Sequence, residues 1–199
     1  MRGFRSSGSR TAVAMLLGLL AVAAPGPAGA DDALAARELE TFEAWLDSAR
    51  AGYGCDEGPA LFRNKTVEAA YPGRRFYYVL TYARGIPPPY KKPTTVVAEV
   101  AGAQVRTIHP VSMDGYRTGL KRVGSAKDAR LAAAAVMILA TADPGERRWR
   151  FDPSNFKVQR RGGRWVCSYA HGSALYTSQV IFDKAGVLSS FQAGAPPVP

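Results

Sequence analysis

Apolar residues recur at steps of three and four in the segment that follows residue 30. The stripe contains, in order, Ala35, Leu39, Phe42, Leu46 and Ala49. The acids Glu38, Glu40, Glu43 and Asp47 fall mostly outside it. This spacing predicts an amphipathic helix with one buried face. Asp31 and Asp32 stand at its start, where carboxylates can accept hydrogen bonds from free amides and suit the helix dipole.

Short runs rich in β-branched and aromatic residues follow, separated by turn residues. In the first half, "KTVEAAY" and "FYYVLTYAR" flank "PGRR", while "TTVVAEV" and "QVRTIHP" flank "AGA". Each pair predicts an antiparallel hairpin. The prolines of "GIPPPYKKP" separate the two hairpins, because proline cannot join a central strand. The polar, glycine-marked stretch "VSMDGYRTGLKRVG" predicts a loop.

The second half repeats the order of helix, hairpin and hairpin. Ser125 with Asp128 three residues later resembles a capping box, and residues 129–142 are apolar nearly all round, which is typical of a buried helix. "FKVQR" and "RWVCSYAH" flank the turn "RGG", and "LYTSQVIF" and "VLSSFQA" flank the turn "DKAG". Both pairs predict hairpins.

Two octets, "YVLTYARG" at 78–85 and "WVCSYAHG" at 165–172, fall at the same place in this order. Each forms the second strand of the first hairpin of its half. We therefore hypothesise a tandem duplication of a helix-hairpin-hairpin unit. The alternative is a single domain in which two strands look alike.

The expected fold is α+β, with antiparallel sheets packed on two helices. The expected boundaries are a signal peptide at 1–30, a first unit at 31–111, a linker loop at 112–124, a second unit at 125–194 and a proline-rich tail at 195–199. The order of elements is similar to that of exported β-lactamase-inhibitor-like and PepSY-type modules. "FDKAGVL" at 182–188 resembles the closing hairpin of a PepSY unit. That resemblance covers seven residues and carries over no functional residue.

The first 30 residues have the pattern of a cleaved secretory leader. Arg2, Arg5 and Arg10 precede the apolar run "TAVAMLLGLLAVAA", and small residues at 28–30 precede the predicted cut. The run is shorter than the ~20 residues of a membrane-spanning helix, and no later run is long enough. The sequence thus predicts a secreted or periplasmic protein without a transmembrane segment after cleavage.

The two cysteines, Cys55 and Cys167, suit an oxidising compartment. An even pair in an exported chain predicts one disulfide, here closing a loop of about 112 residues. Two buried thiols, or a reactive Cys167, are the alternatives.

Charge is unevenly distributed along the chain. Residues 31–68 contain nine acids and four bases, a net charge of −5, whereas residues 69–199 contain nineteen bases and seven acids, a net charge of +12. A basic body favours an anionic partner, such as an acidic protein or an anionic polymer. The candidate residues for that partner are Arg147, Arg148, Trp149, Arg150, Lys157, Arg160, Arg161 and Arg164. The alternative is an edge hairpin that its charges keep soluble.

No pattern in the chain indicates a catalytic or metal site. His109 and His171 are the only histidines, no CxxC motif occurs, and no glycine-rich phosphate loop is present. His171 lies ~13 Å along a strand from Cys167, too far for proton transfer. A weaker catalytic alternative places His109, from another strand, beside Cys167, with Asp114 or Asp183 orienting the imidazole.

We expect no cofactor and a non-enzymatic, exported binding or inhibitor-like protein. A basic binder of an anionic envelope polymer or nucleic acid is the first alternative. A hydrolase with an unrecognised site is the second.

Overall fold

The computed structural model describes residues 28–49, 53–55, 58–83, 85, 94–109, 113–141, 151–170 and 177–195. These residues form helices and two antiparallel sheets, which confirms the predicted α+β class. Most of the predicted leader and of the proline-rich tail lies outside the described residues.

Sheet 1 belongs to the first half of the chain. Its order is β1-β3-β4-β5, with β2 also paired to β3. The strands are β1 (Tyr53–Gly54), β2 (Ala60–Leu61), β3 (Phe76–Ala83), β4 (Thr94–Ala101) and β5 (Gln104–His109). The hairpin predicted around "AGA" is therefore confirmed as β4–β5.

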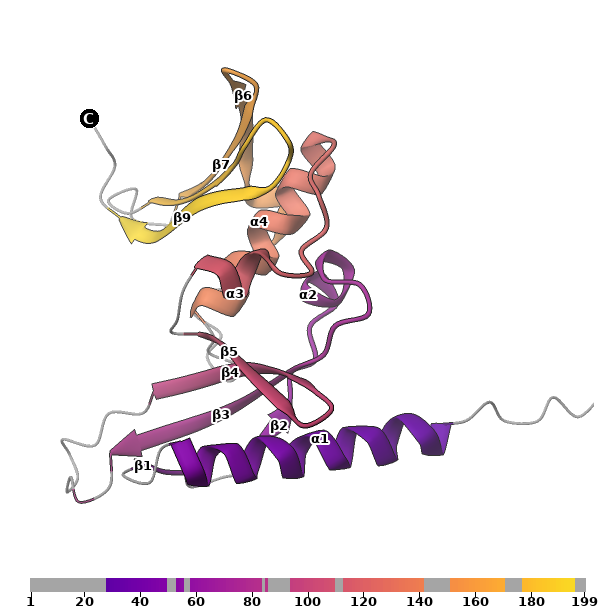
Figure 1. Cartoon of the computed structure of the whole chain (residues 1–199). Helices are drawn as coiled ribbons and strands as arrows, with labels where there is room; N and C mark the ends of the chain where they lie inside the picture. The colour runs from indigo at the N-terminus through magenta and orange to yellow at the C-terminus, as the bar shows by residue number, and fades with distance from the viewer. Residues whose placement is uncertain are drawn as a thin grey trace, which may run out of the picture.

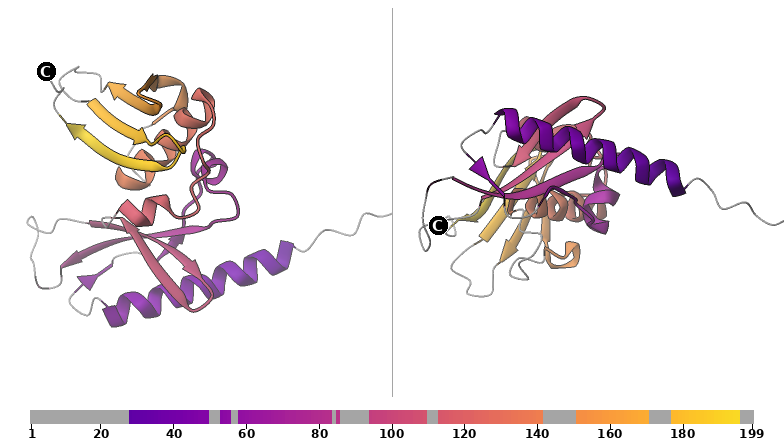
Figure 2. Two further views of the ribbon diagram at one scale, coloured as in Figure 1. Left: turned by 45° about the horizontal axis from the view of Figure 1, so that its top comes forward. Right: turned by 90° about the horizontal axis from the view of Figure 1, so that it is seen from below.

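Helix α1 (Ala28–Ala49) covers one face of sheet 1 and begins three residues before the predicted cut. Phe42 and Leu46 from the predicted stripe are buried there against Tyr77, Val79 and other residues of β3 and β4. Figure 2 shows the helix lying across the sheet. The amphipathic prediction is confirmed, with one difference. Glu38, predicted off the stripe, is only 5% exposed.

Two segments differ from the sequence prediction. The predicted strand "KTVEAAY" is helix α2 (Lys65–Ala70), because the Asn64 side chain accepts hydrogen bonds from the amides of Thr66 and Val67 and caps it. Within the predicted loop, Met113–Arg117 form helix α3. Tyr116 anchors α3 by packing edge-on against Phe191, at 4.8 Å between ring centroids. A single turn of helix is too short for periodicity to reveal.

Helix α4 (Ala126–Thr141) and sheet 2 form the second half. Ser125 caps α4 as predicted, since its hydroxyl accepts from the Asp128 amide and donates to the Asp128 carboxylate. The sheet order is β6-β7-β8-β9. The strands are β6 (Lys157–Arg161), β7 (Arg164–Ala170), β8 (Thr177–Phe182) and β9 (Leu188–Ala195), so both predicted hairpins are confirmed.

The elements stack from α1 through sheet 1 and the shorter helices to sheet 2 (Figure 1). The largest apolar core surrounds α4, whose alanine-rich surface contacts sheet 2, α2 and β5. A smaller core lies between α1 and sheet 1. Sheet 1 is thus covered on both faces, whereas α4 covers one face of sheet 2.

The duplication stays a prediction. In its favour, β3 and β7, which carry the two octets, take the same place in the two strand orders. The covering helices do not follow that match. Alignment of the octets pairs Val79 with Val166, yet Val79 lies under α1, while Val166 lies on the face of sheet 2 opposite α4. If both halves derive from one ancestral unit, its helix must now pack on opposite faces of the two sheets.

Candidate functional site

The strongest candidate site is the hairpin formed by β6 and β7. Lys157, Arg160, Arg161 and Arg164 all lie on it, and each side chain is exposed. The other four predicted residues, Arg147, Arg148, Trp149 and Arg150, lie outside the described residues. The structure therefore brings half of the predicted basic set onto one two-stranded unit.

Local sequence explains the hairpin. Gly162 and Gly163 both have positive φ, 56° and 81°, which suits the two central residues of a tight hairpin turn. This turn sets Arg161 directly opposite Arg164, and the register continues as Arg160 opposite Trp165 and Val158 opposite Cys167.

The register divides the hairpin into two faces. Cys167 is fully buried under α4, and its cross-strand partners Val158 and Val180 share that side. We call the opposite side the open face. It contains Lys157, Gln159, Arg161, Arg164, Val166, Ser168, Ala170, Thr177, Gln179, Ile181, Ser190 and Gln192.

Arg160 differs from the other basic residues of the hairpin. It lies on the α4 side, where its guanidinium stands over the Trp165 ring at 5.3 Å from the centroid. Such a cation–π contact holds the guanidinium and covers one face of the indole. The basic residues of the open face are therefore Lys157, Arg161 and Arg164.

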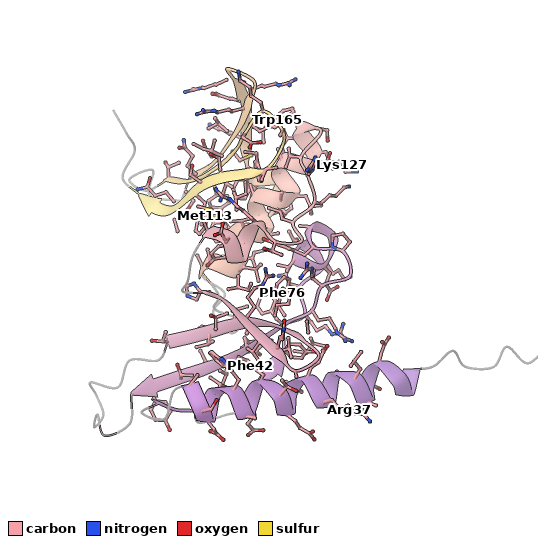
Figure 3. All side chains as sticks on the ribbon, in the orientation of Figure 1. Arg37, Phe42, Phe76, Met113, Lys127 and Trp165 are labelled. Carbon is pink, nitrogen blue, oxygen red and sulfur yellow. The ribbon has the colours of Figure 1, made fainter. Side chains whose placement is uncertain are left out.

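No carboxylate neutralises these side chains within the described part of the chain. Lys157, Arg160 and Arg164 have no ion pair there, and Arg161 donates through Nε to Oε1 of Gln159 at 2.9 Å. Figure 3 shows Trp165 near the end of the molecule farthest from α1, where nitrogen-tipped side chains project outward.

Arginines near sheet 1 behave differently. Arg74 and Arg106 both bind the carboxylate of Glu99, which is 6% exposed. Arg75 binds Glu38 at 2.9 Å, and the Tyr77 hydroxyl donates to the same carboxylate. The Glu38 contacts join α1 to β3 and the turn before it, and the Glu99 contacts join β4 to β5 and that same turn, so these charges are structural.

Lys184 is a basic residue of this region that the sequence did not indicate. It lies in the β8–β9 turn, and a methyl group added to Gly163 would lie only 3.1 Å from its Cγ. The adjoining Asp183 is already engaged, because its carboxylate accepts from the amides of Ala185 and Val187. The β6–β7 turn and the β8–β9 turn lie side by side because of the register of sheet 2, and local sequence does not reveal that register.

The structure does not contain the predicted disulfide. Cys55 and Cys167 are both free, Cys55 exposed after β1 and Cys167 buried on β7. The Cys167 thiol donates to the Ala129 carbonyl of α4 at 3.5 Å, so the helix covers its sulfur. Burial raises the pKa of Cys167 to about 12, which keeps the thiol protonated at neutral pH and poorly nucleophilic.

The groups of the weaker catalytic hypothesis have other contacts. Nδ1 of His109 lies 3.4 Å from the Tyr116 hydroxyl, and burial lowers the His109 pKa. Asp114 pairs with Arg117 at 3.1 Å. His171 lies outside the described residues. Within the described ranges, no three His, Cys, Asp or Glu side chains gather into a set able to hold a metal ion.

Comparison of the chain with protein-family models, curated proteins and solved structures finds no match. The resemblance of residues 182–188 to a PepSY hairpin therefore rests on those seven residues alone. Across the described residues, no helix combines the length and apolarity needed to cross a bilayer.

Proposed function

We propose that the chain is an exported, non-enzymatic binding protein that presents the open face of sheet 2 to an anionic partner. The observation that carries the proposal is the exposed set Lys157, Arg161 and Arg164, which has no acidic partner within the described residues. Arginine forks match the oxygens of carboxylate and phosphate groups.

A purely protective role explains only part of this set. Basic residues on an edge strand hinder edge-to-edge aggregation, and β6 is an edge of sheet 2. Arg164, however, belongs to the interior strand β7, whose ladder with β8 begins at the next residue, Trp165. An interior strand needs no such protection, so Arg164 favours a binding role.

The test is retention on an immobilised polyanion over a range of salt concentrations. A variant with Lys157, Arg161 and Arg164 changed to Gln is compared with a control that changes Arg37, Arg63 and Lys65 to Gln. The control residues are exposed and belong to α1 or to the segment around the α2 cap, and they remove the same charge. We expect the first variant to bind at least tenfold more weakly and the control to stay within about threefold of the unchanged chain.

Equal losses in the two variants would show that net charge alone drives retention. Retention that does not respond to salt would also count against the proposal, because binding through cations releases counterions.

Export is tested separately. The full-length chain is expressed in a secreting bacterial host, and the exported protein is sequenced from its N-terminus. We expect it to begin at Asp31, and an intact N-terminus with retention inside the cell would contradict export.

A further inference from the structure

Arg161 and Arg164 form an unusual pair. They lie directly opposite each other across the β6–β7 ladder, and both are exposed. Like charges at opposed positions repel each other and destabilise a sheet. A bound anion between the two guanidinium groups would turn that repulsion into two favourable contacts.

Arg161 is held in place before any ligand arrives. Its Nε donates to Oε1 of Gln159, two residues earlier on the same face, at 2.9 Å. This bond keeps the guanidinium over the open face and leaves its terminal nitrogens without a partner among the described residues. A fork that is already oriented loses less conformational entropy when it binds.

A further positive charge extends the site along the strand. Lys157 is four residues before Arg161 on the same face of β6, which places their backbones roughly 13 Å apart. Charges spaced along one strand suit an extended polymer with repeated charges better than a single small anion.

The open face offers little for recognising rings. Its described residues are Lys, Arg, Gln, Ser, Thr, Ala, Val and Ile, with no aromatic side chain among them. Trp165 lies on the other side, with Arg160 over its ring. Nucleic-acid bases stack on exposed aromatic rings, and this surface presents none.

We propose that the open face binds a linear phosphodiester polymer through its backbone, with Arg161 and Arg164 on one phosphate group and Lys157 on another. A phosphodiester group carries its oxygens in a tetrahedral arrangement, which lets two forks approach one phosphate from different directions. A carboxylate can also accept from two arginines, as Glu99 does with Arg74 and Arg106, so a polycarboxylate is the competing partner that the experiment has to include. This inference rests on the proposed function and names the chemistry of its partner.

The experiment measures binding by fluorescence anisotropy with three labelled probes of equal charge. They are a DNA strand made only of abasic residues, an oligothymidylate and a polyglutamate. We expect the two phosphodiester probes to bind within threefold of each other and polyglutamate to bind at least tenfold more weakly. For the two phosphate groups contacted, log K should fall with log salt with a slope of about −1.4.

Conservative variants distinguish bidentate binding by the guanidinium groups of Arg161 and Arg164 from binding by positive charge alone. The double change R161K and R164K keeps both charges but loses both forks, so phosphodiester binding should weaken at least tenfold. R160K is the matched control, because Arg160 lies on the α4 side, and it should bind as the unchanged chain does. Circular dichroism melts check that every variant is folded.

The outcomes distinguish the two proposals. If the R161K and R164K double variant binds normally while the triple glutamine variant fails to bind, the proposed anion binding stands. The proposed contact of both arginine forks with one phosphate is then wrong. Equal or tighter binding of polyglutamate would point to an acidic protein partner, and much tighter binding of oligothymidylate would point to base recognition. Either result overturns the phosphodiester inference. Failure of all three probes at low salt would overturn the proposed function as well.

Discussion

The two sheets of this protein use arginine in opposite ways. Around sheet 1, Arg74 and Arg106 share the buried Glu99, and Arg75 binds the buried Glu38. On the open face of sheet 2, Arg161 and Arg164 have no carboxylate partner within the described residues. Residues of one type therefore form buried ion pairs in one region and stay exposed, without an acidic partner among the described residues, in the other.

Coverage of the sheets explains this difference. Helix α1 covers one face of sheet 1, and α2 and α4 cover the other. A charged side chain placed there loses its hydration and needs a partner of opposite charge. Sheet 2 is covered by α4 on one face, and charges on its open face keep their hydration. A charge that the fold does not need to neutralise is the better indicator of a binding site.

The largest expected effect comes from Glu99→Ala. This change leaves Arg74 and Arg106 without their shared carboxylate, and removal of one member of a buried ion pair costs about 3–5 kcal/mol. Since the two arginine side chains are 34% and 37% exposed, we expect a loss near the lower end, about 3 kcal/mol. Urea unfolding measures it, with Arg164→Ala as the control, expected within about 0.5 kcal/mol. Similar losses in both variants would remove the contrast between the sheets.

Tyr77→Phe should have the next largest effect. The Tyr77 ring is fully buried, and its hydroxyl donates to the Glu38 carboxylate on α1. Loss of a hydrogen bond to a charged group costs about 1.5–3 kcal/mol. Tyr78→Phe is the matched control, on the opposite side of β3 and partly exposed, and should change the free energy of unfolding by less than about 0.5 kcal/mol. An unchanged free energy of unfolding in Tyr77→Phe would show that the packing of α1 does not depend on this hydrogen bond.

Alkaline pH should destabilise the contact between α4 and sheet 2. Burial raises the pKa of Cys167 from its ordinary 9.0 to about 12, so the stabilising contribution of the protonated thiol is complete below pH 9 and disappears as the pH rises toward 12. The free energy of unfolding should fall by up to about 1.4 kcal/mol per pH unit in that window. Cys167→Ala should show a shallower slope, and identical slopes would place the alkaline sensitivity elsewhere, for example at Tyr116, whose pKa burial also raises to about 12.

The smallest effect concerns the opposed arginines. Arg164→Thr removes a like-charge pair and adds a residue that favours strands, so the protein should become more stable by about 0.2–1 kcal/mol. Thermal unfolding at low salt measures the gain, which should shrink at high salt because salt screens the repulsion. A destabilised variant would mean that Arg164 makes a structural contribution, and the argument for a binding role would weaken.

Some features of the fold were readable from local sequence. The stripe through Phe42 and Leu46, the Ser125 cap of α4 and the turn residues at Gly162 and Gly163 each depend on neighbours a few positions apart. Short-range patterns of this kind determine helices and hairpins. The basic character of the β6–β7 hairpin was visible for the same reason.

Other features required the three-dimensional arrangement. Thr66 and Val67 suggested a strand, but the cap at Asn64 and the packing of α2 on α4 favour a helix. Cys55 and Cys167 formed a plausible pair by count alone, until the position of Cys167 beneath α4 was known.

By itself, the sequence determined the two long helices α1 and α4, most hairpins and the excess of positive charge, because these depend on spacing and composition within short segments. Only the tertiary structure decided which charges are neutralised. Glu99 and its arginines are separated by up to 25 residues, and Glu38 and Tyr77 by 39, so their pairing depends on how the elements pack. The cations of sheet 2 that have no acidic partner among the described residues could be recognised only once the paired arginines around sheet 1 were known.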